Sequence, residues 1–185
     1  MTLAVREEWM TVEAFLDWHP DGEKWELIGG IPVQAMGEGG LHDAVKTSVT
    51  VAIGRRLRAP SPCRPGVDSR VVQIDTLTAY RPDVHINCAP FGDPMDQVIE
   101  KPAVVFEVAV TSLGRDLLDK RANYFRHPDV EHVVIVNAVE RIVHHFRRGE
   151  GRERVVGFHD TLVLDGTVSL DLPVAEFFEF LPEGA

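Results

Sequence analysis

The strongest hydrophobic pattern lies near the middle of the chain, where an apolar run gives way to a helical repeat. Residues 104–110 are almost entirely Val, Phe and Ala, which is typical of a strand buried on both faces. Glu107 is the one acid in this run, and alternation places its side chain on the opposite face of the strand from Phe106 and Val108. Residues 113–125 then follow a helical period. The pattern predicts a buried strand that carries one carboxylate and leads into a helix.

A second strand is predicted just upstream, at residues 83–88. This run alternates polar and apolar residues after Pro82, and it places Asp83 on its polar face. If the two strands are neighbours, Asp83 and Glu107 lie side by side. On the predicted helix, one face carries residues spaced four apart: Asp116, Lys120 and Tyr124. The two carboxylates and the lysine can therefore converge at one point.

The remaining pattern predicts shorter elements around this centre. Helices are expected at 11–18, 41–57 and 173–178, and strands at 25–28, 31–35, 67–75, 131–137, 141–147, 153–158, 161–164 and 168–170. The proline-rich stretch 59–66 and the polar stretch 89–101 are expected to be loops. This order predicts an α/β (α+β) fold with a mixed central sheet flanked by helices, an N-terminal helix and hairpin, and C-terminal hairpins.

Size and composition favour a single compact domain that spans residues 1–185. The hydrophobic content of 44% is enough for a sizeable core. No long apolar segment or signal-peptide pattern is present, so we expect a cytoplasmic protein without membrane association. Cys63 and Cys88 are far apart in sequence and form no CxxC pattern, so we expect reduced thiols, with neither a disulfide nor a zinc site.

The charge distribution bears on nucleic-acid binding. The net charge of −10 argues against a broad DNA interface, because duplex affinity depends largely on Lys and Arg. Arginines nevertheless gather in the segments 55–81 and 141–154, where we expect contact with DNA. An alternative stays open, in which these arginines are solvated and paired locally with acids.

Two adjacent carboxylates repel each other and are costly to ionise where water is scarce. A divalent cation removes that cost, and Mg²⁺ (or Mn²⁺) uses one or two carboxylates while leaving room for phosphates. Such a centre suits hydrolysis of a phosphodiester. The alternatives are that Asp83 is a strand-edge residue, that Glu107 forms a salt bridge with Lys120 and binds no metal, and that Lys120 is a solvated residue paired with Asp116.

Several motifs together resemble a known family. They are Trp25–Gly30, His42, Arg81–Val84 and the ordered set Glu107, Ser112, Asp116, Lys120 and Tyr124. The chain resembles the PD-(D/E)XK nuclease superfamily and, more narrowly, the Uma2 family, also called DUF820, over roughly residues 11–178. The resemblance implies a restriction-endonuclease-like fold and a Mg²⁺-dependent endodeoxyribonuclease, with Asp83 and Glu107 as metal ligands.

The chain departs from the superfamily pattern at the lysine. Ala109 stands two residues after Glu107, where the plain motif has Lys, and the resemblance implies that Lys120 supplies the charge from the helix. Glu26 is a further candidate carboxylate or a surface residue of the hairpin. His42 is predicted to contact phosphate or orient Glu26, or else to be a capping or core histidine. Tyr124 could donate a hydrogen bond into the site, or simply pack.

The sequence also allows functions other than a nuclease. A non-catalytic DNA-binding or interaction domain that keeps the fold is the main alternative. A zinc or cupin-like site at His85 is disfavoured because the adjacent residues His144 and His145 point oppositely along a strand, and a serine hydrolase lacks the Gly-x-Ser-x-Gly elbow at Ser112. The apolar last helix, which contains Phe177 and Phe178, should pack on the core or on a second subunit, and if it is exposed it makes, with the acidic balance of the chain, a homodimer plausible.

Overall fold

The computed structural model describes residues 9–18, 24–34, 39–58, 60–68, 70–110 and 115–181, with the side chains of 115–118 left aside. Within these ranges the helices are α1 (Val12–Asp17), α2 (Gly40–Arg56), α3 (Arg115–Tyr124) and the 3-10 helix η1 (Val174–Phe178). Among the described residues, no helix combines the length and apolar character needed to span a membrane.

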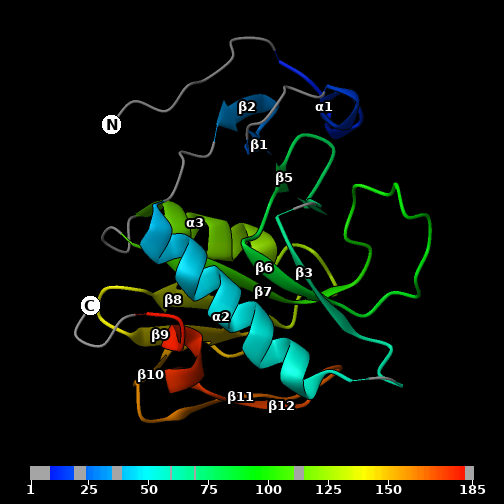
Figure 1. Cartoon of the computed structure of the whole chain (residues 1–185). Coiled ribbons are helices and arrows are strands. Elements are labelled where there is room, and N and C mark those ends of the chain that lie inside the picture. The colour runs from blue at the N-terminus through cyan, green and yellow to red at the C-terminus, as the bar shows by residue number, and fades with distance from the viewer. Residues whose placement is uncertain are drawn as a thin grey trace.

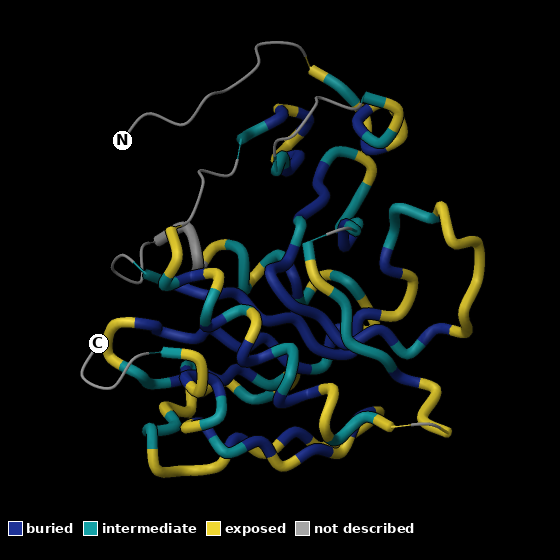
Figure 2. The backbone as a smooth tube through the Cα atoms, viewed as in Figure 1, coloured by how far each residue is buried: buried dark blue, intermediate teal, exposed yellow. Residues whose placement is uncertain are grey.

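A six-stranded mixed sheet forms the centre of the molecule, in the order β10-β9-β8-β7-β6-β3. Its strands are β3 (Arg64–Val67), β6 (Val84–Asn87), β7 (Pro102–Ala109), β8 (His132–Asn137), β9 (Ile142–Arg147) and β10 (Arg154–Val156). Strands β7 and β8 are parallel and are joined through α3, and the other neighbours are antiparallel. Every residue of β7 and β8 is buried, as the apolar runs predict (Figure 2).

One face of this sheet is covered by α2 and the C-terminal elements (Figure 1). Alternate valines of β7, β8 and β9 pack there against the stripe of α2 that contains Val45, Val49 and Ile53. The hairpin of β11 (Thr161–Leu164) and β12 (Leu170–Pro173) completes this face, together with η1. Phe177 and Phe178 are buried in the core of the same chain. The argument for a homodimer from an exposed apolar helix is therefore wrong.

The opposite face carries a second, smaller core. Tyr80, Ile99 and Tyr124 pack there against Val105 and Ile135 of the central strands. Above this face lies a four-stranded sheet in the order β2-β1-β5-β4 (Figure 1). Its strands are β1 (Trp25–Ile28), β2 (Ile31–Gln34), β4 (Val72–Gln73) and β5 (Ala79–Tyr80), and α1 packs beside them. Helix α3 and this small sheet bring polar residues to the same end of β6 and β7.

Three local expectations were wrong. The strand predicted at 67–75 is divided between β3, which ends at Val67, and β4, which belongs to the four-stranded sheet. Strand β3 begins at Arg64, inside the stretch predicted to be irregular, because Pro65 is tolerated on a strand at the edge of the sheet. Cys63 and Cys88 form a disulfide, with Cα atoms 4.0 Å apart, instead of remaining as thiols. The pairing of Arg64 with Asn87 places the two cysteines opposite each other at the next position. Their separation of 25 residues along the chain gave no hint of that register.

Candidate functional site

Three acids lie at neighbouring positions across β3, β6 and β7, with Asp68 just after β3, Asp83 just before β6 and Glu107 within β7. Val67 of β3 pairs with Val84 of β6, and Val84 pairs with Phe106 of β7. The residues next to these three on the same side are Asp68, Asp83 and Glu107. Asp83 and Glu107 are almost wholly buried, whereas the side chain of Asp68 is 36% exposed. The predicted proximity of Asp83 and Glu107 therefore follows from strand register, and Asp68 extends the row.

The Asp83 carboxylate is held from three directions. Oδ2 accepts a hydrogen bond from the backbone N–H of Val108 at 2.8 Å and lies 3.1 Å from Nε2 of His42. Oδ1 accepts a 2.5 Å hydrogen bond from Nζ of Lys24. Burial alone would raise the pKa of Asp83, but the His42 hydrogen bond and the Lys24 charge outweigh it and hold that pKa well below its usual range. Asp83 is therefore an anion although it is buried.

The Glu107 carboxyl group is in a different electrostatic state. Both of its contacts use Oε1, which accepts a 2.6 Å hydrogen bond from the Tyr124 hydroxyl and lies 3.7 Å from Nζ of Lys120. Burial raises the pKa of Glu107 to about 8, with Lys120 opposing this and Asp83 and Glu26 adding to it. The pKa values of the two central acids are thus shifted in opposite directions. Oε2 of Glu107 takes no part in the contacts with Tyr124 and Lys120.

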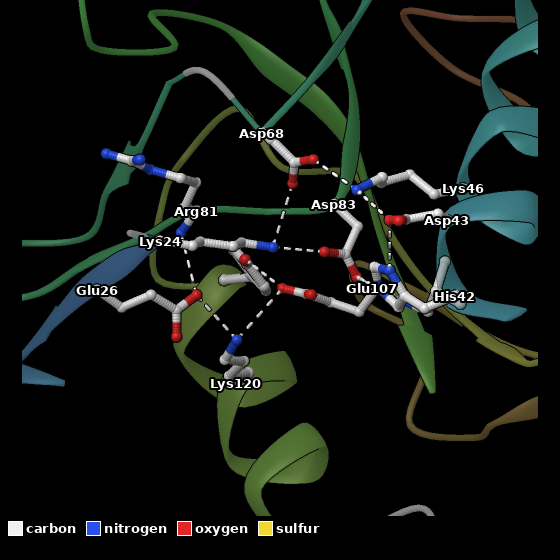
Figure 3. Close-up of polar contacts among 12 residues, drawn as sticks. Lys24, Glu26, His42, Asp43, Lys46, Asp68, Arg81, Asp83, Glu107 and Lys120 are labelled. Atoms are coloured by element: carbon white, nitrogen blue, oxygen red, sulfur yellow. Dashed lines mark hydrogen bonds and ion pairs between the residues drawn. The ribbon is translucent and has the colours of Figure 1, made fainter. Parts of the chain in front are cut away.

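Lys120 joins α3 to two acids from other elements (Figure 3). Its Nζ donates a 2.8 Å hydrogen bond to Oε1 of Glu26 and lies 5.7 Å from the ring centroid of Tyr80. Burial opposes the charge, but Glu107 and Glu26 prevail, and they raise the pKa of Lys120 above its ordinary value. The interpretation of Lys120 as a solvated residue is therefore wrong. Glu26, which also accepts the Arg81 N–H at 3.1 Å, is a buried member of this cluster and is not a surface residue.

The other predicted residues lie at different distances from this centre. His42, on the first turn of α2, is buried and contacts Asp83, as a core histidine would, and its role toward Glu26 stays a prediction. Tyr124 reaches Glu107 through its hydroxyl and also packs against Tyr80, with ring centroids 5.4 Å apart. Asp116 belongs to α3, and its side chain is outside the described part of the structure.

Sequence reasoning missed a set of charged residues beside Asp83. Nζ of Lys24 lies 3.2 Å from Oδ1 of Asp68, and Oδ2 of Asp68 accepts a 2.7 Å hydrogen bond from Lys46 on α2. Lys46 also lies 3.2 Å from Asp43. Alternation along β1 contained a usable indication for Lys24, because it lies two residues before Glu26 and shares its face. The position of Asp68 depends on the β3–β6 register, which the sequence does not reveal.

Four of the eleven clustered arginines have acidic partners among the described residues. Arg55 and Arg56, at the end of α2, pair with Glu179 and Glu176, each at 2.7 Å. In the second segment, Arg147 and Arg154 both pair with Glu150. For these four residues the alternative of local pairing is confirmed. Arg81 differs, because its buried Nε finds no hydrogen-bond partner among the described residues.

The donor atoms bear on which metal the site could hold. Within the described ranges, no three His, Cys, Asp or Glu side chains come together as a ready metal-binding group. The pair Asp83 and Glu107 instead offers carboxylate oxygens of the kind that Mg²⁺ prefers, and Mg²⁺ needs only one or two of them because it keeps several waters. The chemistry of the pair therefore fits Mg²⁺ or Mn²⁺ and does not resemble a zinc site.

Comparison with known proteins identifies the family. The model of the Uma2 family, described as "Putative restriction endonuclease", matches residues 12–175. The chain belongs to the Uma2 family. The structure is similar to a crystal structure described as that of "a putative nuclease belonging to DUF820" from Anabaena variabilis ATCC 29413. The two have a TM-score of 0.76 and 17% sequence identity, over 94% of this chain and 99% of that chain.

A comparison with curated proteins finds no match. The family and the fold class expected from the Uma2 motifs are confirmed, and at 17% identity the structural likeness speaks for the fold alone. The geometry described above is therefore the basis for the candidate functional residues, which are Asp83, Glu107, Lys120 and Glu26.

Proposed function

We propose that this Uma2-family chain is a Mg²⁺- or Mn²⁺-dependent endodeoxyribonuclease that hydrolyses DNA phosphodiester bonds. The observation that carries the proposal is the meeting of two carboxylates from adjacent strands, Asp83 and Glu107, with the ammonium of Lys120 3.7 Å from Glu107. Charged groups are costly to bury, and such clusters concentrate at functional sites. Membership of a family described as restriction endonucleases supports the same conclusion.

Asp83 and Glu107 would hold the metal ion. The ion, when bound, polarises a phosphoryl oxygen and lowers the pKa of an attacking water. The protein holds both carboxylates in place beforehand. Val108 N–H and His42 fix Asp83 through Oδ2, and the Tyr124 hydroxyl fixes Glu107 through Oε1. Asp83 Oδ1 and Glu107 Oε2 are left for the ion, although Lys24 contacts the former.

Lys120 supplies a fixed positive charge beside this pair. Its raised pKa keeps the ammonium protonated at neutral pH, so it acts as an electrostatic group and not as a general base. Glu26 anchors it with a 2.8 Å hydrogen bond from the far side. An ammonium held in this way can orient the attacking water and stabilise the negative charge that develops on the phosphoryl oxygens.

One observation favours a second candidate, a non-catalytic DNA-binding or interaction domain. The carboxylates already have internal counter-ions, because Lys24 contacts Asp83 and Lys120 contacts both Glu26 and Glu107. A domain that uses these pairs only for its fold would need no metal. In that case, removing Glu107 should change stability, and Mg²⁺ should not alter thermal stability.

The deciding experiment compares cleavage of supercoiled plasmid by wild type and Glu107→Gln, in Mg²⁺, in Mn²⁺ and in EDTA. Glutamine keeps the shape and can still accept the Tyr124 hydrogen bond, so the fold should persist. We expect the metal-dependent rate to fall by about 10³-fold or more, equivalent to about 4 kcal/mol. Glu179→Gln, at the exposed pair with Arg55, is the matched control and should cleave like wild type. Equal rates for Glu107→Gln and wild type, or equal rates in EDTA and Mg²⁺, would rule out the proposal.

A further inference from the structure

Lys24 occupies the oxygen of Asp83 that a metal ion would need. Its Nζ lies 2.5 Å from Oδ1 of Asp83, while Oδ2 is already engaged by Val108 and His42 (Figure 3). Lys24 immediately precedes β1, and only 23% of its side chain is exposed. The lysine therefore supplies, from within the chain, the positive charge that the buried Asp83 carboxylate requires.

Asp68 gives the same ammonium a second carboxylate as an ion-pair partner. Its Oδ1 lies 3.2 Å from Nζ of Lys24, so Lys24 stands between two carboxylates. Asp68 has φ of 42°, a left-handed conformation that non-glycine residues seldom adopt. Lys46 fixes the other oxygen of Asp68 at 2.7 Å. The carboxylate is thus held in a strained backbone position with one oxygen directed at Lys24.

Two cations cannot share one carboxylate oxygen without strong repulsion, because like charges at contact distance interact unfavourably in a poorly hydrated site. A divalent ion bound at Asp83 and Glu107 would therefore expel the Lys24 ammonium from Oδ1. Asp68 immediately follows β3, and its Oδ1 is already 3.2 Å from the ammonium, so only a short movement of the flexible Lys24 side chain is required. This arrangement keeps Lys24 paired in both states, so its burial is compensated before and after metal binding.

We propose that Lys24 is a resident counter-ion of Asp83, which yields to the divalent ion by shifting its ammonium to Asp68. This inference rests on the proposed function in that it assigns Asp83 and Glu107 as the metal ligands. Lys24 neutralises Asp83 in the metal-free protein, and the intrinsic metal affinity is lowered by the free energy needed to break that pair. Asp68 limits this loss. The two residues therefore act on metal affinity in opposite directions.

Mn²⁺ binding tests the proposal without any need for cleavage. Free Mn²⁺ is measured by electron paramagnetic resonance, with calorimetry in parallel, for wild type, Lys24→Met, Asp68→Asn and the double variant. We expect Lys24→Met to bind Mn²⁺ about tenfold more tightly or better, and Asp68→Asn to bind it several-fold more weakly. Because Asp68 acts through Lys24, the double variant should match Lys24→Met. Lys101→Met, at an exposed lysine, is the control and should match wild type.

A second measurement guards against a purely structural explanation. In EDTA, Lys24→Met should lower the melting temperature because Asp83 loses its counter-ion. Added Mn²⁺ should then raise the melting temperature of Lys24→Met by more than it raises that of wild type. If Lys24→Met does not fold, Lys24→Gln, which can still donate to Asp83, carries the same prediction. Unchanged or weaker Mn²⁺ binding by the Lys24 variant, or wild-type binding by Asp68→Asn, would overturn the inference.

The outcome is separable from that of the nuclease proposal. If the variants show the expected pattern of Mn²⁺ affinity and wild type does not cleave DNA, the counter-ion role stands and the nuclease fails. If wild type cleaves DNA with Mg²⁺ and Lys24→Met binds Mn²⁺ no better, the nuclease stands and the counter-ion role fails. Absence of any Mn²⁺ binding by wild type and Lys24→Met overturns both.

Discussion

Two buried polar groups lie on opposite faces of the central sheet and are held in different ways. The carboxylate cluster consists of Lys24, Glu26, Asp83, Glu107 and Lys120, on the face shared with α3. The histidine pair lies on the α2 face, where Nδ1 of His132 is 2.9 Å from Nε2 of His145 and the rings stack with centroids 5.1 Å apart. The three acids of the cluster and both histidines are nearly inaccessible to solvent, so burial of these residues does not distinguish the two groups.

The difference between them is charge. Burial lowers the pKa of both histidines, that of His145 to about 4, so the pair is neutral at physiological pH. The second ring nitrogen of His132 is satisfied by the carbonyl of Asp165 at 2.9 Å. The carboxylate cluster instead keeps ionised groups inside, at a desolvation cost that well-packed apolar residues would avoid. Retaining buried charge calls for a functional explanation, whereas a satisfied neutral pair needs only a structural one.

Lys120→Met should have the largest effect that distinguishes the carboxylate cluster from the histidine pair. Loss of the ammonium should reduce the metal-dependent cleavage rate by about 10²–10³-fold, because a fixed charge near the phosphoryl oxygens is removed. The same change leaves the buried Glu26 without its partner and should lower the free energy of unfolding by about 3 kcal/mol. Plasmid cleavage and urea unfolding measure the two effects.

Adding Glu26→Gln to Lys120→Met separates the catalytic effect from the structural one. Neutralising Glu26 should recover most of the lost stability while cleavage stays low. His145→Leu, on the other face, serves as the comparison and should lose about 1–3 kcal/mol of stability with an unchanged rate per folded molecule. Recovery of cleavage together with stability in the Lys120–Glu26 double variant would show that Lys120 acts only through the fold.

The histidine pair should make stability depend on pH in a defined window. An unfolded histidine titrates near pH 6.5, whereas the folded pKa of His145 is about 4, so the unfolded state binds more protons between these values. The free energy of unfolding should therefore fall as pH drops below about 6.5, by about 2 kcal/mol at pH 5.0 and about 3 kcal/mol at pH 4, and be unaffected by this pair above pH 7. Urea unfolding in EDTA at pH 7.5 and 5.0 measures it.

The informative quantity in that experiment is the difference between wild type and His145→Gln. The neighbouring charges of Arg154, Glu150 and Asp165 are present in both proteins, as is Glu107, whose raised pKa contributes with the opposite sign. These contributions cancel in the difference. If His145→Gln loses as much stability as wild type between pH 7.5 and 5.0, the pair is not the source of the dependence.

The central elements of the fold follow from local patterns, and the exceptions have physical causes. Apolar runs identified β7 and β8, and a helical repeat identified α3. Strand β5 has only two residues, too few for a periodic pattern, and pairs locally with β4 and over a long range with β1. The edge position of β3, which tolerates Pro65, is likewise a property of the assembled sheet.

The site likewise divides into contacts that local patterns predict and contacts that depend on the assembled fold. Alternation and a four-residue helical spacing were enough to predict that Glu107 and Lys120 can converge and that Tyr124 shares the helix face of Lys120, because these residues belong to one strand–helix unit. The contacts of Lys24 with Asp83 and of Asp68 with Lys24 join segments that are far apart in sequence. The sequence therefore predicts the acids, but the cations that balance Asp83 depend on how the small sheet and α2 are placed against the central strands.

Tyr124→Phe makes the smallest change to the carboxylate cluster, since it removes only a hydroxyl. The ring should keep its packing against Tyr80, while Glu107 loses the 2.6 Å hydrogen bond to Oε1. A buried carboxyl group that loses a donor should cost about 1–2 kcal/mol in the free energy of unfolding, measured in urea with EDTA present. Cleavage should also slow, because Glu107 is less well oriented.

Tyr80→Phe is the matched control for this prediction, because Tyr80 is the ring against which Tyr124 packs. Its hydroxyl accepts a 2.9 Å hydrogen bond from the part-buried amide of Asn123 and makes no contact with Glu107, so its loss should cost less than about 1 kcal/mol and leave cleavage unchanged. Equal effects of the two substitutions on both stability and cleavage would mean that the Tyr124 hydroxyl contributes only as any buried hydroxyl does. The carboxylate cluster would then resemble the histidine pair in this respect, with its hydrogen bonds serving the fold and only its charges serving chemistry.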